Sequence, residues 1–556
     1  MIMKRVNIIG GGLAGLSAAL TLAEHGVPCR IVSLQISERA QSVLAEGGIN
    51  AALDLMGQGD TPAEHMEDTL KGGADLADPQ AVRGLAEAAP GIVKRLRELG
   101  VPFMMSGNRM IQRSFGGQKK KRTAYCKSST GKALMTAMID EVRKYEGTLL
   151  ERFPHHRFLG LKIDGEICEG AFIGDEYTGE RLYLPGPVIL AFGGPAGLFP
   201  GLTTGSTAND GDALAIIFSQ GVEAANLEMI QYHPTTAAFP GKRLLISEAA
   251  RGEGGRLFVL RGGERWYFME ELHPELGNLA PRDVISREMD RIRRDPACGD
   301  QVYLDLTSLS GEVWRARLSD LREEVLRYLG QDPAKTPVPV SPGIHYFMGG
   351  VRVDAAHRAG LKNLYVAGEC ACQYHGANRL GGNSLLGALY GGRRAAETVL
   401  SENTEFQSGG SGQGSPAAGC GTESIAETGC GTEIIAETGS GTEGTSANFP
   451  ERTPEVTADL GRILAGALGI SRNEETLLGA LTELQALYER AGSSMDRKRI
   501  LLGEAAVRCA LARKESRGAH LREDCPLRDD ARYRRQTVAS CSPEGVSVRF
   551  GEITGT

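Results

Sequence analysis

The chain has 556 residues, of which 41% are hydrophobic and 24% are charged, and its formal net charge is −7. The composition is ordinary for a globular protein, and the length exceeds one compact core, so roughly two to four domains are expected. The negative charge gives a phosphate backbone no general attraction, and we expect no nucleic-acid partner.

The eleven cysteines are scattered, without a C-x-x-C pair. The close spacing of Cys370 and Cys372 is by itself a poor metal site. We therefore expect reduced thiols, no metal, and no iron–sulfur cluster held within this chain.

The first 26 residues resemble a signal peptide in one respect, because Lys4 and Arg5 precede an apolar run. Glycines interrupt that run at Gly10, Gly11, Gly12 and Gly15. Such a pattern favours a strand, a tight turn and a helix over a signal helix. No later stretch reaches the roughly 18 to 20 apolar residues of a membrane span, so we expect membrane attachment only through a partner.

Apolar patterning predicts a strand at Val6–Ile9, a helix at Leu13–Glu24 and a second strand at Cys29–Ser33. Together they form a βαβ start. Further strands are expected at Val188–Phe192 and Leu364–Ala367, each ending near glycine. We expect these strands to return to the same nucleotide-binding sheet.

The first turn, Gly10 to Gly15, fits G-x-G-x-x-G between a strand and a helix. Glycines there let the backbone approach a pyrophosphate, and the helix N-terminus supplies donors. The second strand ends in Ser33 instead of the acidic residue that binds a ribose in simple NAD sites. A dinucleotide other than NAD is favoured over both a simple NAD site and a glycine turn without a ligand.

Residues 408–447 contain a ten-residue repeat, because 419–428 recurs at 429–438. The tract is rich in Gly, Ser, Thr and Glu and would bury little apolar surface, so we predict a linker. A short solenoid is the alternative, but so few weak copies would not stack stably.

Further stretches share one property: each resembles a motif of a single family, in that family's order. They are Arg39–Asn50, Arg113–Gly117, Gln231–Thr235, Ser247–Gly255, Pro281–Asp283, His345–Gly350, His375–Leu385, Glu515–His520 and Arg528–Asp530. The family is that of the flavoprotein subunits of succinate dehydrogenase and fumarate reductase, to which L-aspartate oxidase is related. The resemblance covers most of the chain outside 403–450.

The resemblance implies an α/β fold: a Rossmann-like FAD-binding domain with an inserted α+β capping domain and a C-terminal helical bundle. We expect the FAD-binding domain at 1–225 and 344–402, and the capping domain, which holds substrate, at 226–343. The low-complexity linker would occupy 403–450, the helical domain 451–530 and a C-terminal tail 531–556.

The cofactor implied by the resemblance is FAD. Its pyrophosphate is expected at Gly10, Gly12 and Gly15, and its flavin face at Ser42, Gly47 and Gly48. Its ribityl chain and ring edges are expected at Asp210, Glu369, Ser384 and Leu385.

The implied substrate is a C4 dicarboxylate. Arginine and histidine suit its two carboxylates, and His233, His345 and Arg379 supply them. Taken singly, His233 reads more simply as a core histidine and Arg379 as a surface cation. By resemblance, Ser247 adds a hydroxyl, while Phe115 and the amides around Gly47 press the substrate against the flavin.

The resemblance gives the proton-transfer role to Arg282. An arginine is a poor acid or base unless a relay returns its proton, and Glu248 and Arg251 would form that relay. A structural ion pair is the alternative for Glu248, and both can hold. In the reducing direction the flavin would deliver hydride to one alkene carbon while Arg282 protonates the other.

The sequence departs from the family's complex-bound members at Gln41, where they attach FAD through a histidine. An amide cannot form that bond, so we expect non-covalent FAD and a reaction that favours fumarate reduction over succinate oxidation. L-Aspartate oxidase is the main alternative activity. A flavin electron-transfer subunit without turnover is a third.

The expected partners are an iron–sulfur subunit and a membrane anchor. We expect a cytoplasmic location, at the inner face of the cell membrane where partner subunits hold the chain there.

Overall fold

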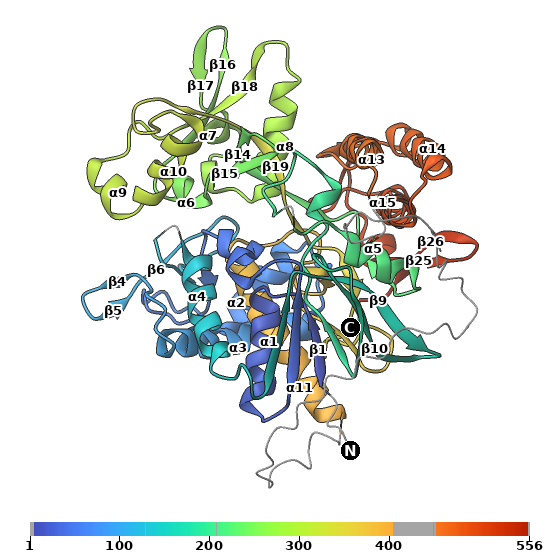
Figure 1. Ribbon diagram of the computed structural model, residues 1–556. Coiled ribbons are helices and arrows are strands. Elements are labelled where there is room, and N and C mark those ends of the chain that lie inside the picture. Colours follow the sequence, from blue (N-terminus) through green and yellow to red (C-terminus); the bar gives the residue numbers. More distant parts are fainter. Residues whose placement is uncertain (1–4, 128, 207, 404–448, 450–451, 554–556) are drawn as a thin grey trace.

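The computed structural model describes residues 5–127, 129–206, 208–403, 449 and 452–553 (Figure 1). The repeat tract at 408–447 and the linker predicted there lie outside these residues.

A five-stranded parallel sheet forms the centre of the lower half of the molecule in Figure 1. Its strands, in spatial order, are β21 (Leu364–Val366), β12 (Val188–Leu190), β1 (Val6–Ile9), β2 (Cys29–Ser33) and β8 (Leu150–Pro154). The expected return of distant strands to one sheet is confirmed. β12 and β21 end earlier than predicted, because the chain turns away at Gly193 and Gly368, both with positive φ.

Helices and a small sheet cover the two faces of the parallel sheet. α1 (Leu13–Glu24) packs against α11 (Asn383–Glu402), where a Cβ on Gly392 would lie 2.1 Å from the Ala14 carbonyl oxygen. An antiparallel sheet of β9 (His156–Asp164), β10 (Ile167–Asp175) and β11 (Arg181–Pro185), which the sequence analysis did not foresee, shares a core with β12. Because both faces are covered, β1 is buried along its whole length.

Three helices from the N-terminal part of the chain extend this half of the molecule: α2 (Pro62–Gly72), α3 (Pro79–Glu98) and α4 (Thr130–Arg143). A fourth helix, α5 (Asp212–Ser219), packs against β9 and the C-terminal part of the chain.

The cap, residues 230–347, is built on a separate six-stranded sheet (Figure 1, top). Its order is β15 (Lys242–Leu245), β14 (Ile230–Phe239), β19 (Val338–Phe347), β18 (Cys298–Asp305), β16 (Arg256–Arg261) and β17 (Glu264–Trp266). Its helices are α6 (Glu248–Gly252), α7 (Phe268–Leu272), α8 (Arg282–Arg293), α9 (Gly311–Ala316) and α10 (Ser319–Leu329).

The cap has its own hydrophobic core, which includes Leu257, Phe268, Ile285 and Val302. β19 continues to Phe347, past the boundary expected at residue 343, and stays paired with β14 there, so His345 lies within the cap sheet.

The C-terminal part contains the predicted helices: α13 (Pro454–Ala467), α14 (Glu474–Arg490) and α15 (Ser494–Ala512). The tail beyond residue 530, to which no element was assigned, forms the hairpin of β25 (Gln536–Ser542) and β26 (Gly545–Gly551). β25 pairs with β13 (Ala224–Ala225), so the tail closes a second five-stranded sheet with β20 (Gly350–Arg352) and β22 (Ala371–Cys372). The architecture is mixed α/β.

Within the described residues, no helix is both long enough and apolar enough to cross a membrane. The cysteines in this part of the chain form no disulfides, and most are buried.

Candidate active site

A cavity of about 720 Å³ lies between the nucleotide-binding half and the cap. The glycine turn after β1, the loop at 39–48 and the start of α11 line it on one side. The β15–α6 segment and α10 of the cap line it on the other. Such a volume is in the range of cofactor and substrate sites.

The glycine turn presents open backbone to this cavity. Gly10, with φ +128, and Gly12 line it, and Gly12 caps α1 without a side-chain hydrogen bond. Ser42 Oγ accepts from the Leu13 N–H at 3.2 Å. Because Gly12 has no side chain to cap α1, the first turn can receive a phosphate group, as dinucleotide sites require, although Ser42 already holds one of its amides.

Gly15 was expected at the pyrophosphate, but it is not among the residues that line the cavity. A Cβ there would lie 1.9 Å from the Gly10 carbonyl oxygen. The residue has to be glycine because helix and turn approach each other closely.

The loop expected at the flavin face also lines the cavity, through Ser42, Gly47 and Gly48. Arg113 donates to the Gly47 carbonyl and stacks on Tyr125 at 4.1 Å, which fixes the loop. Burial lowers the pKa of Arg113 to about 10.

Phe115 does not line the cavity. Its ring lies behind Gly47 and Gly381, where an added Cβ would come within 3.0 Å of it. The structure thus places Phe115 behind the loop, as a support for it.

Gln41 faces the cavity, and its Oε1 accepts a 2.6 Å hydrogen bond from the Ser206 N–H. Its side chain is therefore held by the backbone of a neighbouring loop. The amide offers no nucleophile at this position.

The residues expected at the ribityl chain and ring edges are Asp210, Glu369, Ser384 and Leu385, and all four line the cavity. Ser384 and Leu385 stand in the first turn of α11. Glu369 Oε1 accepts from the Phe347 N–H at 3.0 Å, and burial raises the pKa of Glu369 to about 7.

Asp210 carries an ion pair that the sequence did not indicate. Its Oδ2 lies 2.6 Å from Arg452 Nη2 and 3.4 Å from Arg157 Nη1. The carboxylate is thus neutralised by Arg452, which stands just before the C-terminal helices.

Two histidines expected to bind substrate meet at the cap end of the cavity. His233 on β14 and His345 on β19 have ring centroids 5.2 Å apart. His233 Nδ1 accepts from the Thr235 N–H, so its Nε2 carries the proton, and this buried atom has no protein partner. Burial and the nearby Arg282 place the pKa of both imidazoles well below the usual value, so both rings are neutral donors or acceptors.

Arg379 is buried in the loop that precedes α11 and lines the same end of the cavity. Its guanidinium lies 4.4 Å over the Tyr346 ring, and its Nε has no hydrogen-bond partner. Burial, followed by repulsion from Arg282, lowers the pKa of Arg379 to about 9. A buried cation without a carboxylate partner is a strong site for an anion.

Arg282 and Glu248 form a buried ion pair beside these cations. Arg282 Nη2 and Nε lie 2.8 and 2.9 Å from Glu248 Oε2, and the Gly116 N–H donates to Oε1 at 2.8 Å. Arg251 approaches Oε1 from the far side at 4.0 Å and does not line the cavity. Burial raises the pKa of Glu248. Arg282, Arg251 and the Gly116 amide together lower it by more than burial raises it, so the net pKa shift is downward.

Ser247, which precedes this pair, lines the cavity and caps α6 by accepting from the Ala249 N–H. The structure therefore brings His233, His345, Arg379, Ser247, Arg282 and Glu248 together at one end of one cavity.

The sequence analysis missed two positioning contacts. Gln231 accepts from Arg282 Nη1 at 3.1 Å and donates to the Arg379 carbonyl at 2.8 Å, so it links the two arginines. Its place two residues before His233 in a buried strand was a usable signal. Thr204 Oγ1 lies 2.9 Å from His345 Nδ1 and belonged to no motif.

In the described part of the chain, no group of three or more His, Cys, Asp or Glu side chains is arranged to hold a metal ion.

Models of known families match most of the chain. The profile described as "FAD binding domain" matches residues 5–385, and "Fumarate reductase flavoprotein C-term" matches 496–554. The succinate dehydrogenase flavoprotein subunit of Bacillus subtilis is 34% identical over 97% of this chain and 94% of its own length. An L-aspartate oxidase of Agrobacterium fabrum is 34% identical over 95% and 92%. The FrdA chain of E. coli quinol fumarate reductase has a TM-score of 0.83 at 26% identity, covering 100% of this chain and 97% of that one.

The fold and the glycine turn, with helix N-termini facing one cavity, define an FAD-binding oxidoreductase. The chain belongs to the succinate dehydrogenase and fumarate reductase flavoprotein family, which also includes L-aspartate oxidases.

Proposed function

We propose that this protein reduces fumarate to succinate as the flavoprotein subunit of a larger enzyme, with FAD held by contacts alone. The supporting observation is the convergence of Arg379, His233 and His345 beside the Arg282–Glu248 pair, with Arg379 Nε and His233 Nε2 buried and without a hydrogen-bond partner. A dicarboxylate supplies the anionic charge that this buried cationic cluster lacks.

In the proposed mechanism, Arg379 and the two neutral histidines bind and orient the substrate carboxylates. FAD, when bound, supplies a hydride to one alkene carbon. Arg282 gives a proton to the other carbon, so one hydride and one proton convert the alkene to succinate.

After Arg282 has given up its proton, the Glu248 carboxylate accepts a proton from Arg251 and passes it to Arg282, so Arg251 and Glu248 form the relay and the net proton comes from solvent. Because the group is buried and Glu248 is anionic, the proton moves between fixed partners without solvent reorganisation.

The non-covalent state of FAD rests on Gln41, whose amide is held by Ser206. By the family resemblance, covalent attachment raises the flavin potential. Its loss would weaken succinate oxidation more than fumarate reduction, which is why we propose reduction as the favoured direction.

The alternative is oxidation of L-aspartate, which the similarity to L-aspartate oxidases favours. An ammonium group at this end of the cavity would meet Arg379 and Arg282, while Glu248 is already paired. The charge distribution therefore supports fumarate over aspartate.

The test uses purified chain loaded with FAD. With a reduced low-potential artificial donor, fumarate should be consumed readily, and succinate should reduce artificial acceptors slowly. Peroxide formation from aspartate and oxygen that outpaces fumarate consumption would establish the alternative instead. A bound flavin with no turnover of any of the three compounds would favour an electron-transfer subunit.

We also propose that an iron–sulfur subunit and a membrane anchor complete the enzyme and hold this chain on the cytoplasmic side of the cell membrane. The support is that several relatives are named as subunits. Purification of the tagged chain from its native cells should yield an iron-containing partner, and a chain that purifies alone would count against this assembly.

A further inference from the structure

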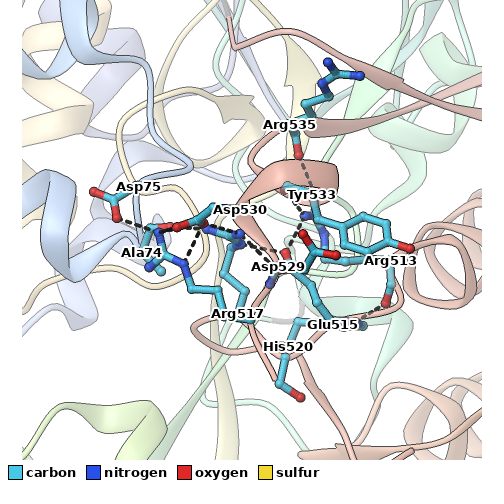
Figure 2. A network of polar contacts seen from close by, with 12 residues as sticks. Ala74, Asp75, Arg513, Glu515, Arg517, His520, Asp529, Asp530, Tyr533 and Arg535 are labelled. Atoms are coloured by element: carbon cyan, nitrogen blue, oxygen red, sulfur yellow. Dashed lines mark hydrogen bonds and ion pairs between the residues drawn. The ribbon is translucent and has the colours of Figure 1, made fainter. Parts of the chain in front are cut away.

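The C-terminal segment is fixed by a largely buried network of charged side chains (Figure 2). Arg517 and Glu515, both with fully buried side chains, form a two-pronged ion pair at 2.6 and 2.9 Å. Arg517 also donates to the Ala74 carbonyl at 2.8 Å, and Arg513 joins Glu515 to Glu228. A network with this many buried partners holds its segment in one arrangement.

This network supports a tight turn. Arg517 and His520 exchange backbone hydrogen bonds of 2.8 and 2.9 Å, leaving Gly518 and Ala519 at the tip. His520 is itself fixed, because its Nδ1 accepts from Arg472 and its Nε2 donates to the Arg513 carbonyl.

The tip lies against the loop that carries Arg379. The Ala519 N–H donates to the Ala377 carbonyl at 2.8 Å. Gly518 has φ +53, and a Cβ on it would lie 2.5 Å from that same oxygen. Only glycine allows so close an approach in this conformation.

The tip also contacts the cap. Arg287 on α8 donates to the Gly518 carbonyl and, at 3.2 Å, to Asp283 Oδ2. Asp283 Oδ1 in turn accepts from Asn378 Nδ2 at 2.9 Å. Three parts of the chain, the cap, the Arg379 loop and the C-terminal turn, thus meet in one set of hydrogen bonds.

The partners of the Asp283–Asn378 bond are chain neighbours of the two functional arginines. Asp283 follows Arg282, and Asn378 precedes Arg379. Asn378 also accepts from Gln231, which contacts both arginines. The bond therefore links the cap segment that carries the proposed proton donor, Arg282, to the loop that carries the proposed carboxylate-binding residue, Arg379.

We propose that this junction of Arg287, Gly518, Asp283 and Asn378 docks the cap and sets the position of Arg282 relative to Arg379. Arg287 is then a positioning residue. It acts through the rigid first turns of α8 and touches neither substrate nor cofactor. The expected effect on turnover rests on the proposed function. The docking of the cap does not depend on it.

The test compares Arg287→Ala with two matched variants. Arg287→Lys keeps a donor for the Gly518 carbonyl. Arg291→Ala removes an arginine one turn further along α8 that pairs only with Glu288 on the surface, among the contacts described for it. Turnover of fumarate, FAD occupancy and backbone hydrogen exchange in α8 and residues 375–382 are measured for each.

Losing the charge-assisted bond should lower kcat about tenfold or more in Arg287→Ala, with KM changed less than about threefold. FAD occupancy should stay at the parental value, and α8 amides should exchange at least about tenfold faster than in Arg291→Ala. Arg287→Lys should recover most of both losses.

Equal kinetics and exchange in Arg287→Ala and Arg291→Ala would overturn the junction. If Arg287→Ala fails to fold, Asp283→Asn is the variant to test. It keeps an oxygen that accepts from Asn378 but removes the charge that pairs with Arg287. Faster exchange of α8 in that variant supports docking, and unchanged exchange refutes it. If the unmodified protein does not reduce fumarate, the proposed function is wrong. The hydrogen-exchange comparison would still test whether the junction docks the cap.

Discussion

Replacing Arg282 with glutamine should abolish fumarate reduction while leaving FAD bound. The guanidinium makes two contacts to Glu248, at 2.8 and 2.9 Å, and one to Gln231 at 3.1 Å. A neutral amide cannot donate the proton and cannot replace the buried cation. Loss of a proton donor costs about 10²- to 10⁴-fold, and loss of transition-state charge stabilisation adds to this, so we expect kcat to fall about a thousandfold or more.

The same substitution should lower the free energy of unfolding by about 3 kcal/mol, at the low end for breaking a buried pair. Arg251 and the Gly116 amide remain as partners of Glu248 and limit the cost. Single-turnover kinetics with reduced enzyme measure the chemical step, flavin absorbance measures FAD content, and urea unfolding measures stability. Activity within tenfold of the parent, with normal FAD content, would show that another group protonates the substrate.

Three further predictions concern FAD and the cap. Denatured protein separated on a gel should show no flavin fluorescence at the position of the chain, because Gln41 cannot bond to the flavin; a fluorescent band would contradict this. Gly15→Ala should deplete FAD and destabilise the fold by about 1–3 kcal/mol, since its Cβ would lie 1.9 Å from a carbonyl oxygen. Gly91→Ala, at an open position of α3, is the control, and equal flavin-to-protein absorbance ratios in the two variants would refute the close-packing argument. Burial, and then the nearby Glu324 carboxylate of the cap, raise the pKa of Glu46 well above 4.5. The folded chain therefore binds the Glu46 proton more tightly than the unfolded chain does. This contribution to stability is full below pH 4.5, the ordinary pKa of the group, and is lost as the pH rises through the higher pKa of the folded state. Glu46→Gln should flatten the fall in melting temperature as the pH rises above about 5, whereas Glu323→Gln, exposed on α10, should follow the parent; coincident curves for all three proteins would rule the effect out.

The sequence by itself determined the local elements and the chemical groups of the site. The spans of β1, α1 and β2 follow from apolar periodicity and glycine placement, which are properties of adjacent residues. Arg282, Arg379 and the Glu248 carboxylate followed from family motifs, and the fold brings them to one cavity.

Only the tertiary structure decided which of these groups face the cavity and what holds them. Gly15 and Phe115 stand in the right motifs but pack behind the lining residues, because the packing of neighbouring segments decides which atoms reach the cavity. The partners of the site arginines come from distant parts of the chain: Gln231 lies 51 residues from Arg282, and Gly518 lies 231 residues from Arg287. Local patterns carry no information about such contacts, because a buried polar group takes its partner from whatever the packed fold brings beside it.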